Sequence, residues 1–157
     1  MGLGSVSDLR FSNGTTSPAS ISSSGFTGTF SNLVPKNNPL PNALLGTRPI
    51  KNEGDTTAAT VTLAGLTPNG RYDLYAYTGY YSALFSVGSI SGTATGEGFA
   101  ENNPLNWIEG RQYAKLSSIA ADNSGSLTLT VAGITPNPIG IGTVGLFLTG
   151  KRRGRKR

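Results

Sequence analysis

The acidic side chains nearest the single tryptophan are the residues of this chain that could hydrolyse a sugar polymer. Glu97, Glu101 and Glu109 lie within ten positions of Trp107. Two carboxylates held about 5–10 Å apart can serve as the acid and the base or nucleophile of a glycosidase. Residues 96–106 are rich in Gly, Asn and Glu, which predicts a solvated loop. The pattern favours a non-catalytic protein, with a glycoside-active enzyme as an alternative.

The composition excludes several other kinds of catalytic and metal site. The chain contains no His and no Cys, so Ser-His-Asp triads, Cys-His dyads, and His- or thiolate-ligated zinc are ruled out. Residues 140–145 match the dinucleotide-binding glycine pattern, but a Pro-rich loop precedes them and a short strand follows, where a strand and then a helix are required. No spaced acidic loop indicates calcium. We therefore expect no enzyme activity, no cofactor and no metal.

Aromatic residues form the candidate ligand-binding set. Tyr75 and Tyr77 alternate with Leu74 and Ala76, so we expect both rings on the sheet face opposite Leu74. Such rings can stack on sugars while their polar tips bond hydroxyl groups. The alternative is structural, with the tyrosines as ordinary strand residues and the tryptophan in the core. The predicted ligand-binding residues are Tyr75, Tyr77, Tyr80, Tyr81 and Trp107, with Phe85 beside them.

The last seven residues carry six of the thirteen basic side chains of the chain. Residues 1–150 keep the remaining seven, against eight acidic ones, so the domain is nearly neutral. We expect residues 151–157 to be a disordered tail that contacts polyanions, either nucleic acid or an acidic polysaccharide or membrane surface. The predicted polyanion-binding residues are Lys151, Arg152, Arg153, Arg155, Lys156 and Arg157.

The element that must position the tyrosines is a strand, corner and strand over residues 59–78. Val61 and Leu63 alternate with threonines before the corner, as Leu74 and Ala76 alternate with tyrosines after it. Between the strands, Asn69-Gly70 tolerates positive φ, so the chain can reverse there. Leu66, Pro68 and Tyr72 have the spacing of a tyrosine corner, in which the Tyr hydroxyl bonds to backbone a few residues upstream.

Further candidate strands extend along the rest of the chain, and they predict one all-β domain over residues 1–150. They lie at residues 7–11, 19–24, 26–30, 84–87, 89–95, 112–117, 127–131 and 143–149. Residues 36–55 are expected to be a long connection, since four prolines in and beside it exclude a central strand. No apolar run reaches the roughly 20 residues of a membrane span, and no signal peptide is visible in residues 1–6. The pattern predicts a two-sheet antiparallel β-sandwich of jelly-roll type.

Four blocks carry a resemblance to a known family: residues 61–77, 107–116, 121–131 and 144–148. In order and spacing they resemble the β-sandwich domain of secreted, often PEP-CTERM-anchored, proteins of environmental bacteria. The resemblance covers about residues 8–149 and implies an extracellular domain, similar in outline to carbohydrate-binding jelly rolls, whose relatives begin further upstream with a signal peptide. Fibronectin type III modules share the tyrosine-corner spacing and are the alternative fold.

Together these observations predict a non-catalytic extracellular module for adhesion, surface-matrix or carbohydrate binding. The low charged fraction of 13%, about half the usual share, suits such a surface. The alternative is a structural, self-assembling protein of capsid-like jelly-roll type, whose basic tail binds nucleic acid.

Overall fold

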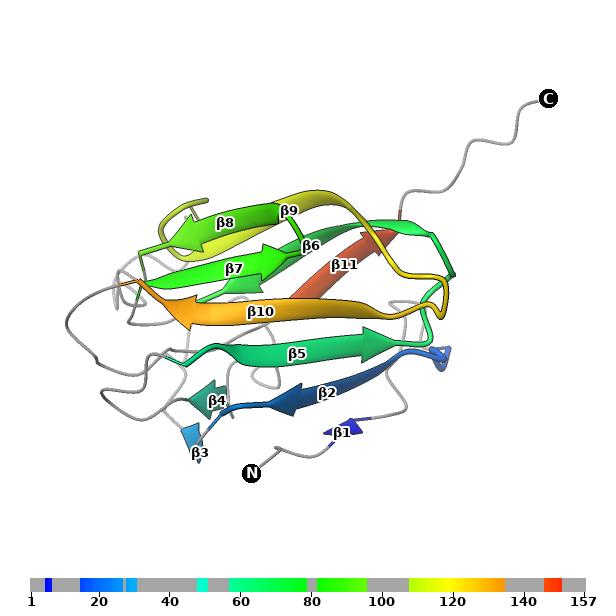
Figure 1. The fold of residues 1–157 in the computed structure, drawn as a ribbon, viewed down its shortest axis with the longest axis horizontal. Helices are drawn as coiled ribbons and strands as arrows, with labels where there is room; N and C mark the ends of the chain where they lie inside the picture. The colour runs from blue at the N-terminus through cyan, green and yellow to red at the C-terminus, as the bar shows by residue number, and fades with distance from the viewer. Residues whose placement is uncertain are drawn as a thin grey trace.

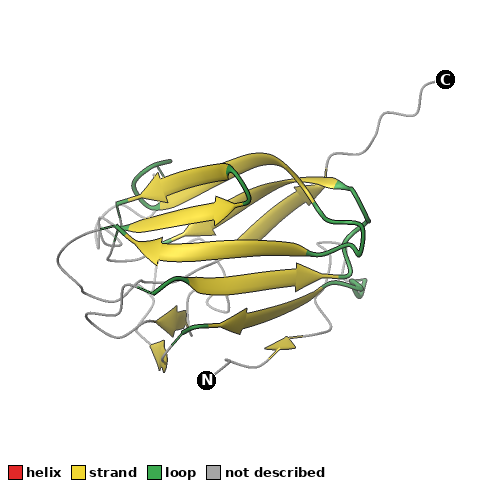
Figure 2. Ribbon diagram, in the orientation of Figure 1, coloured by secondary structure: helices red, strands yellow, loops and turns green. Residues whose placement is uncertain are grey.

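The computed structural model describes eight ranges of the chain: residues 5–6, 15–26, 28–30, 48–50, 57–78, 82–95, 108–134 and 146–150. Side-chain surroundings are described for residues 15–26, 57–78, 82–95 and 108–134. Every described element is a strand, and no helix occurs in these ranges (Figure 2). The prediction of an all-β protein is therefore confirmed.

The strands form two main sheets and one short ribbon (Figure 1). The six-stranded sheet has the order β1 (Ser5–Val6), β2 (Ser20–Ser24), β5 (Ala59–Ala64), β10 (Leu127–Gly133), β7 (Ala83–Val87) and β8 (Ile90–Ala94). The three-stranded sheet has the order β11 (Leu146–Gly150), β6 (Arg71–Tyr77) and β9 (Tyr113–Ala120). The ribbon joins β3 (Gly28–Phe30) to β4 (Arg48–Ile50).

Every strand pair is antiparallel, and the two main sheets pack face to face as a β-sandwich. The predicted sandwich is thus confirmed, whereas its jelly-roll type and the fibronectin-like alternative stay predictions. The connection expected over residues 36–55 contains a strand at residues 48–50, β4; it is an edge strand, so the exclusion of a central strand by the prolines holds there, and the other residues of the range fall outside the described ones. Pro49 is tolerated there because both strands of a two-stranded ribbon are edge strands.

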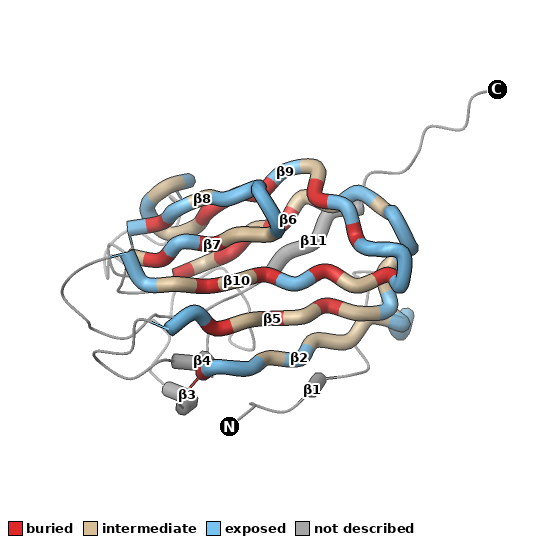
Figure 3. The backbone as a smooth tube through the Cα atoms, in the orientation of Figure 1, coloured by how far each residue is buried: buried red, intermediate tan, exposed pale blue. Residues whose placement is uncertain are grey.

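The core lies between the sheets and is made by the alternation read from the sequence. Val61 and Leu63 of β5 and Leu74 and Ala76 of β6 are all buried in one hydrophobic cluster, and Figure 3 shows buried segments along both strands. Each fully buried aliphatic side chain of leucine or valine size contributes about 1.5–3 kcal/mol. The other large buried side chains are Phe26, Phe85, Leu116, Ile119, Leu127, Leu129 and Val131.

The predicted tyrosine corner is present between β5 and β6. The Thr67 N–H donates a hydrogen bond of 2.9 Å to the Tyr72 hydroxyl oxygen. Asn69 takes the positive φ of 55° that the Asn-Gly pair was expected to supply. The corner forms from residues close in sequence, which explains why it could be predicted without the tertiary structure.

The turn between β9 and β10 locks onto this corner. The Leu66 N–H donates to the Gly125 carbonyl at 2.9 Å, and the Ala121 N–H donates to the Gly70 carbonyl at 2.9 Å. Gly125 has φ +77°, and a Cβ at this position would overlap the Leu66 carbonyl oxygen. Only glycine fits both requirements, so the two turns form one interlocked end of the sandwich.

The sheets approach closely where β8 crosses β9. A Cβ added to Gly92 of β8 would lie 3.2 Å from the Cβ of Ala114 in β9. Small residues on both strands therefore let the edge of the large sheet rest on the small sheet. This contact holds β9 of the small sheet against β8 of the large sheet.

The outer face of the large sheet carries hydroxyl groups and no charge. Strands β2, β5, β10, β7 and β8 contain no Asp, Glu, Lys or Arg. The Ser24 and Thr60 hydroxyls are 2.8 Å apart, and those of Thr62 and Thr128 are 3.4 Å apart. The charged side chains of the described strands all belong to the small sheet or to β4 of the ribbon.

Candidate ligand-binding face

The outer face of the small sheet is where the structure gathers aromatic and charged side chains. Burial of Leu74 and Ala76 turns Tyr75 and Tyr77 of β6 outward, as predicted. In β9, Ala114 and Leu116 are buried, so Tyr113 and Lys115 face outward as well. We name the set Asp73, Tyr75, Tyr77, Tyr113 and Lys115 the tyrosine face.

The register between β6 and β9 brings these side chains together. Tyr77 pairs with Tyr113, and Tyr75 pairs with Lys115. Residues directly opposite each other in an antiparallel pair have Cβ atoms about 4.5–5.5 Å apart, so their side chains touch. The face is therefore built from cross-strand pairs between segments almost forty residues apart in sequence.

The three rings form a tilted cluster. The Tyr113 ring lies 5.9 Å from the Tyr75 ring at 43°, and 5.6 Å from the Tyr77 ring at 44°. Such aromatic pairs contribute about 0.5–1.5 kcal/mol beyond their buried area. Burial raises the pKa of the Tyr77 hydroxyl, and the neighbouring Tyr113 and Tyr75 raise it further. The Tyr77 hydroxyl thus stays protonated at neutral pH and can both donate and accept hydrogen bonds.

Lys115 places a cation beside the rings. Its Nζ lies 5.4 Å from the centroid of the Tyr75 ring and 3.7 Å from Asp73 Oδ2. A hydrogen bond to Tyr75 is the main reason why the pKa of Lys115 is raised, and the carboxylates of Asp73 and Glu109 add to it. The Lys115 side chain is 32% exposed and that of Asp73 13%, so the ammonium group is charged and within reach of a ligand.

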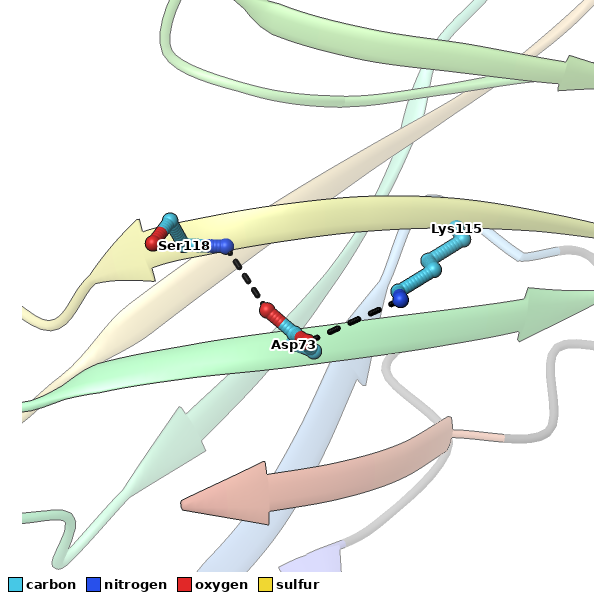
Figure 4. Close-up of polar contacts among 3 residues, drawn as sticks. All are labelled: Asp73, Lys115 and Ser118. Carbon is cyan, nitrogen blue, oxygen red and sulfur yellow. Dashed lines mark hydrogen bonds and ion pairs between the residues drawn. The ribbon is translucent and has the colours of Figure 1, made fainter. Parts of the chain in front are cut away.

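Asp73 links this lysine to a bulge in β9 (Figure 4). Its Oδ1 accepts a hydrogen bond of 2.9 Å from the Ser118 N–H. The β6–β9 register shifts between Tyr72 and Leu74, and Ser118 has φ 60°, as a bulged residue can. Arg71 supports the bulge, since its Nη1 donates to the Ser118 carbonyl at 3.0 Å. Asp73 is therefore held by backbone on one side while its other oxygen faces Lys115.

The structure brings together two of the five ligand-binding residues predicted from the sequence. Tyr75 and Tyr77 lie in the tyrosine face, whereas Tyr80, Tyr81 and Trp107 fall outside the described residues. The inclusion of Phe85 was wrong, because its side chain is fully buried in the core. Phe85 and Leu84 are neighbours in β7 and point to opposite faces of the sheet. Because both are apolar, the sequence does not indicate which of the two points into the core.

Sequence analysis missed Tyr113, Lys115 and Asp73. The signal for the first two was present, because they alternate with Ala114 and Leu116 in a segment predicted as a strand. No sequence signal placed them beside Tyr75, since that requires the strand register. The role of Asp73 likewise depends on the bulge at Ser118.

Of the other candidate residues, Glu109 borders this face and the rest fall outside the described ranges. Glu109 is exposed and pairs with Tyr113 through a backbone bridge, while Glu97 and Glu101 lie outside the described ranges. The six basic residues of the tail fall outside them too: Lys151, Arg152, Arg153, Arg155, Lys156 and Arg157.

Asp122 has the local role expected of a turn residue. Its Oδ1 accepts hydrogen bonds from the Ser124 hydroxyl at 2.6 Å and from the N–H groups of Ser124 and Ser126, both at 2.8 Å. These bonds, led by that of the Ser124 hydroxyl, lower the pKa of Asp122. Asp122 therefore stabilises the turn that locks onto the tyrosine corner.

The described ranges contain neither an acidic metal-binding cluster nor a membrane-spanning helix. No group of three or more acidic side chains in these ranges is placed to hold a metal ion. The same part of the chain contains no helix long and apolar enough to cross a membrane.

Comparison with known proteins yields no relative: no family model, no curated protein and no solved structure matches this chain. The family resemblance drawn from the sequence therefore stays a prediction. The interpretation of the tyrosine face depends on its own geometry and chemistry.

Proposed function

We propose that this protein is a non-catalytic carbohydrate-binding module that acts outside the cell, in adhesion to a polysaccharide or a surface matrix. The observation that carries the proposal is the tyrosine face, where Tyr75, Tyr77 and Tyr113 cluster beside Lys115 and Asp73. The low charged fraction of 13% supports an extracellular setting.

The chemistry of the face suits a sugar. The C–H groups of a pyranose ring can pack on a tyrosine ring, and its hydroxyl groups can bond to phenol, ammonium and carboxylate groups. Because the rings are tilted by 43–44° to one another, the surface of the face is uneven, and a flat ligand would not match it. A polysaccharide chain, with rings at changing angles, can follow it.

The opposite face of the sandwich supports this assignment by contrast. The outward positions of β5 and β10 carry Thr60, Thr62, Thr128 and Thr130, and the strands contain neither charge nor aromatic rings. Of the two main sheets, only the small one carries outward-facing aromatic and charged side chains in the described strands, so the large sheet gives a matched control surface within the same domain.

The alternative of a capsid-like assembly protein, with nucleic acid bound by the tail, depends on residues outside the described ranges. It stays a prediction from the sequence. Steep salt dependence would mark binding by the tail, because cations on a polyanion release counterions. Stacking on the tyrosine face depends little on salt.

The test is the affinity of the full chain for a panel of soluble neutral and acidic polysaccharides, measured at high salt by affinity electrophoresis or calorimetry. We expect Tyr75→Ala and Tyr113→Ala to weaken binding about tenfold each, which corresponds to roughly 1.4 kcal/mol. Thr128→Ala, on the opposite sheet, is the control and should bind as the wild type does. Equal affinity of the tyrosine variants and the control would contradict the proposal.

A further inference from the structure

We propose that the Lys115–Asp73 pair is the polar subsite of the tyrosine face and that it selects neutral sugars with adjacent hydroxyl groups over acidic sugars. This inference rests on the proposed function, because it names the ligand class of the same face. It assigns Lys115 and Asp73 as specificity-determining residues, in addition to the three tyrosines.

The spacing of the pair leaves a place for a ligand hydroxyl. Lys115 Nζ and Asp73 Oδ2 are 3.7 Å apart, which exceeds the about 2.7–3.2 Å of a direct N–H···O hydrogen bond. A hydroxyl oxygen can accept from the ammonium group while its proton is donated to the carboxylate. Contacts longer than about 3.5 Å are commonly bridged in this way, by water or by a ligand group.

Two hydroxyl groups on neighbouring carbons fit the pair better than one. Lysine offers three donors and a carboxylate about four acceptor sites, and the Ser118 N–H bonds to Oδ1 of Asp73. One sugar hydroxyl can therefore accept from Lys115 while its neighbour donates to Asp73. Charge-assisted hydrogen bonds of this kind are roughly twice as strong as those between neutral groups.

The charge balance of the pair disfavours an acidic sugar. Asp73 Oδ2 lies 3.7 Å from Lys115 Nζ, so a carboxylate already faces this positive charge. A uronate or sulfate group that approached Lys115 would also approach Asp73 Oδ2, and like charges repel. A neutral diol gains the two hydrogen bonds without this repulsion.

The pair is also positioned before a ligand arrives. The Ser118 N–H holds Asp73 from the bulge in β9, and the Tyr75 ring lies 5.4 Å from Lys115 Nζ. A sugar that contacts the Tyr75 ring thus lies within reach of the pair. Because strands and not loops hold these groups, little conformational entropy is lost when a ligand binds.

The experiment compares three probes on the full chain at high salt: a neutral galactomannan, the same polymer after periodate oxidation and borohydride reduction, and polygalacturonate. Periodate cleaves the carbon–carbon bond between adjacent hydroxyls, and reduction leaves an uncharged polyalcohol. We expect the native galactomannan to bind at least about tenfold more tightly than either of the other two. Similar affinity for the treated polymer, or preference for polygalacturonate, would overturn the inference.

Two variants separate specificity from stability. Lys115→Met keeps the apolar stem and should weaken galactomannan binding about tenfold while the melting temperature stays close to that of the wild type. Asp73→Asn keeps an oxygen for the Ser118 N–H, and it should shift the ratio of affinities about tenfold toward polygalacturonate. A merely structural role for Asp73 would lower both affinities together, and that result would refute its assignment.

The two proposals fail in different ways. If Tyr75→Ala and Tyr113→Ala lose binding but Lys115→Met binds galactomannan as the wild type does, only the selectivity of the pair is wrong. If none of the polymers binds, the proposed function is overturned, and this inference with it. Thr128→Ala serves again as the control on the opposite sheet.

Discussion

Replacing Tyr72 with phenylalanine removes a single oxygen atom from the corner that joins the two halves of the sandwich. That oxygen accepts the 2.9 Å hydrogen bond of the Thr67 N–H, and the ring itself stays in place. A hydrogen bond of this kind contributes about 0.5–1.5 kcal/mol net. Thr67 is exposed, so water can partly replace the lost acceptor, and we expect Tyr72→Phe to cost about 1 kcal/mol.

The assay is urea unfolding followed by far-ultraviolet circular dichroism. The midpoint should fall while the slope of free energy against urea stays the same, because the surface exposed on unfolding does not change. For a chain of this size the melting temperature should drop by about 2–4 °C for each kcal/mol.

Tyr113→Phe is the matched control, because it removes a hydroxyl from the same sheet. The side chain of Tyr113 packs its ring against those of Tyr75 and Tyr77, and the Gly110 N–H bonds to its backbone carbonyl, which the substitution keeps. The control should change stability by less than about 0.5 kcal/mol. If Tyr72→Phe and Tyr113→Phe had the same effect, the corner hydrogen bond would not stabilise the fold, and the reasoning would be refuted.

Two further predictions concern the turns. Gly125→Ala should cost about 1–3 kcal/mol or more in urea unfolding, since φ +77° and the overlap with Leu66 act together. Gly110→Ala, at φ +83° with no neighbour within 4 Å, should cost less, and an equal cost would contradict the steric argument. Because the folded-state pKa of Asp122 is lowered, its contribution is present above pH about 4 and is lost as the pH falls further. The stability gap between wild type and Asp122→Asn should therefore close on acidification, and a gap that stays constant in urea titrations down to low pH would count against this role.

Much of the fold could be predicted from the sequence because its signals are local. The alternation of Val61 and Leu63 with threonines defines an inward face whatever the partner strand is. The spacing of Leu66, Pro68 and Tyr72 predicts the corner because its hydrogen bond spans only five residues. The turn at Asp122 is equally local, since its acceptor bonds reach residues two and four positions on.

The sequence predicted only Tyr75 and Tyr77 of the five residues in the tyrosine face, and the reason is register. Period-2 alternation places Tyr75 and Tyr77 on the outer face of β6, but it does not say which strand lies beside them. A shift of two residues would keep Tyr113 and Lys115 of β9 on the outer face but pair them with other residues of β6. No local pattern in either segment determines that choice.

What the sequence determined by itself is most of the strand pattern, the corner and the outward face of strands with clear alternation such as β5 and β6, because these follow from neighbours a few residues apart. What only the tertiary structure decided is the meeting of Lys115 and Asp73 beside the tyrosines. That meeting depends on the bulge at Ser118, which shifts the β6–β9 register between Tyr72 and Leu74. It is a long-range property, since the packing of the whole sandwich fixes which residues of the two strands stand opposite each other.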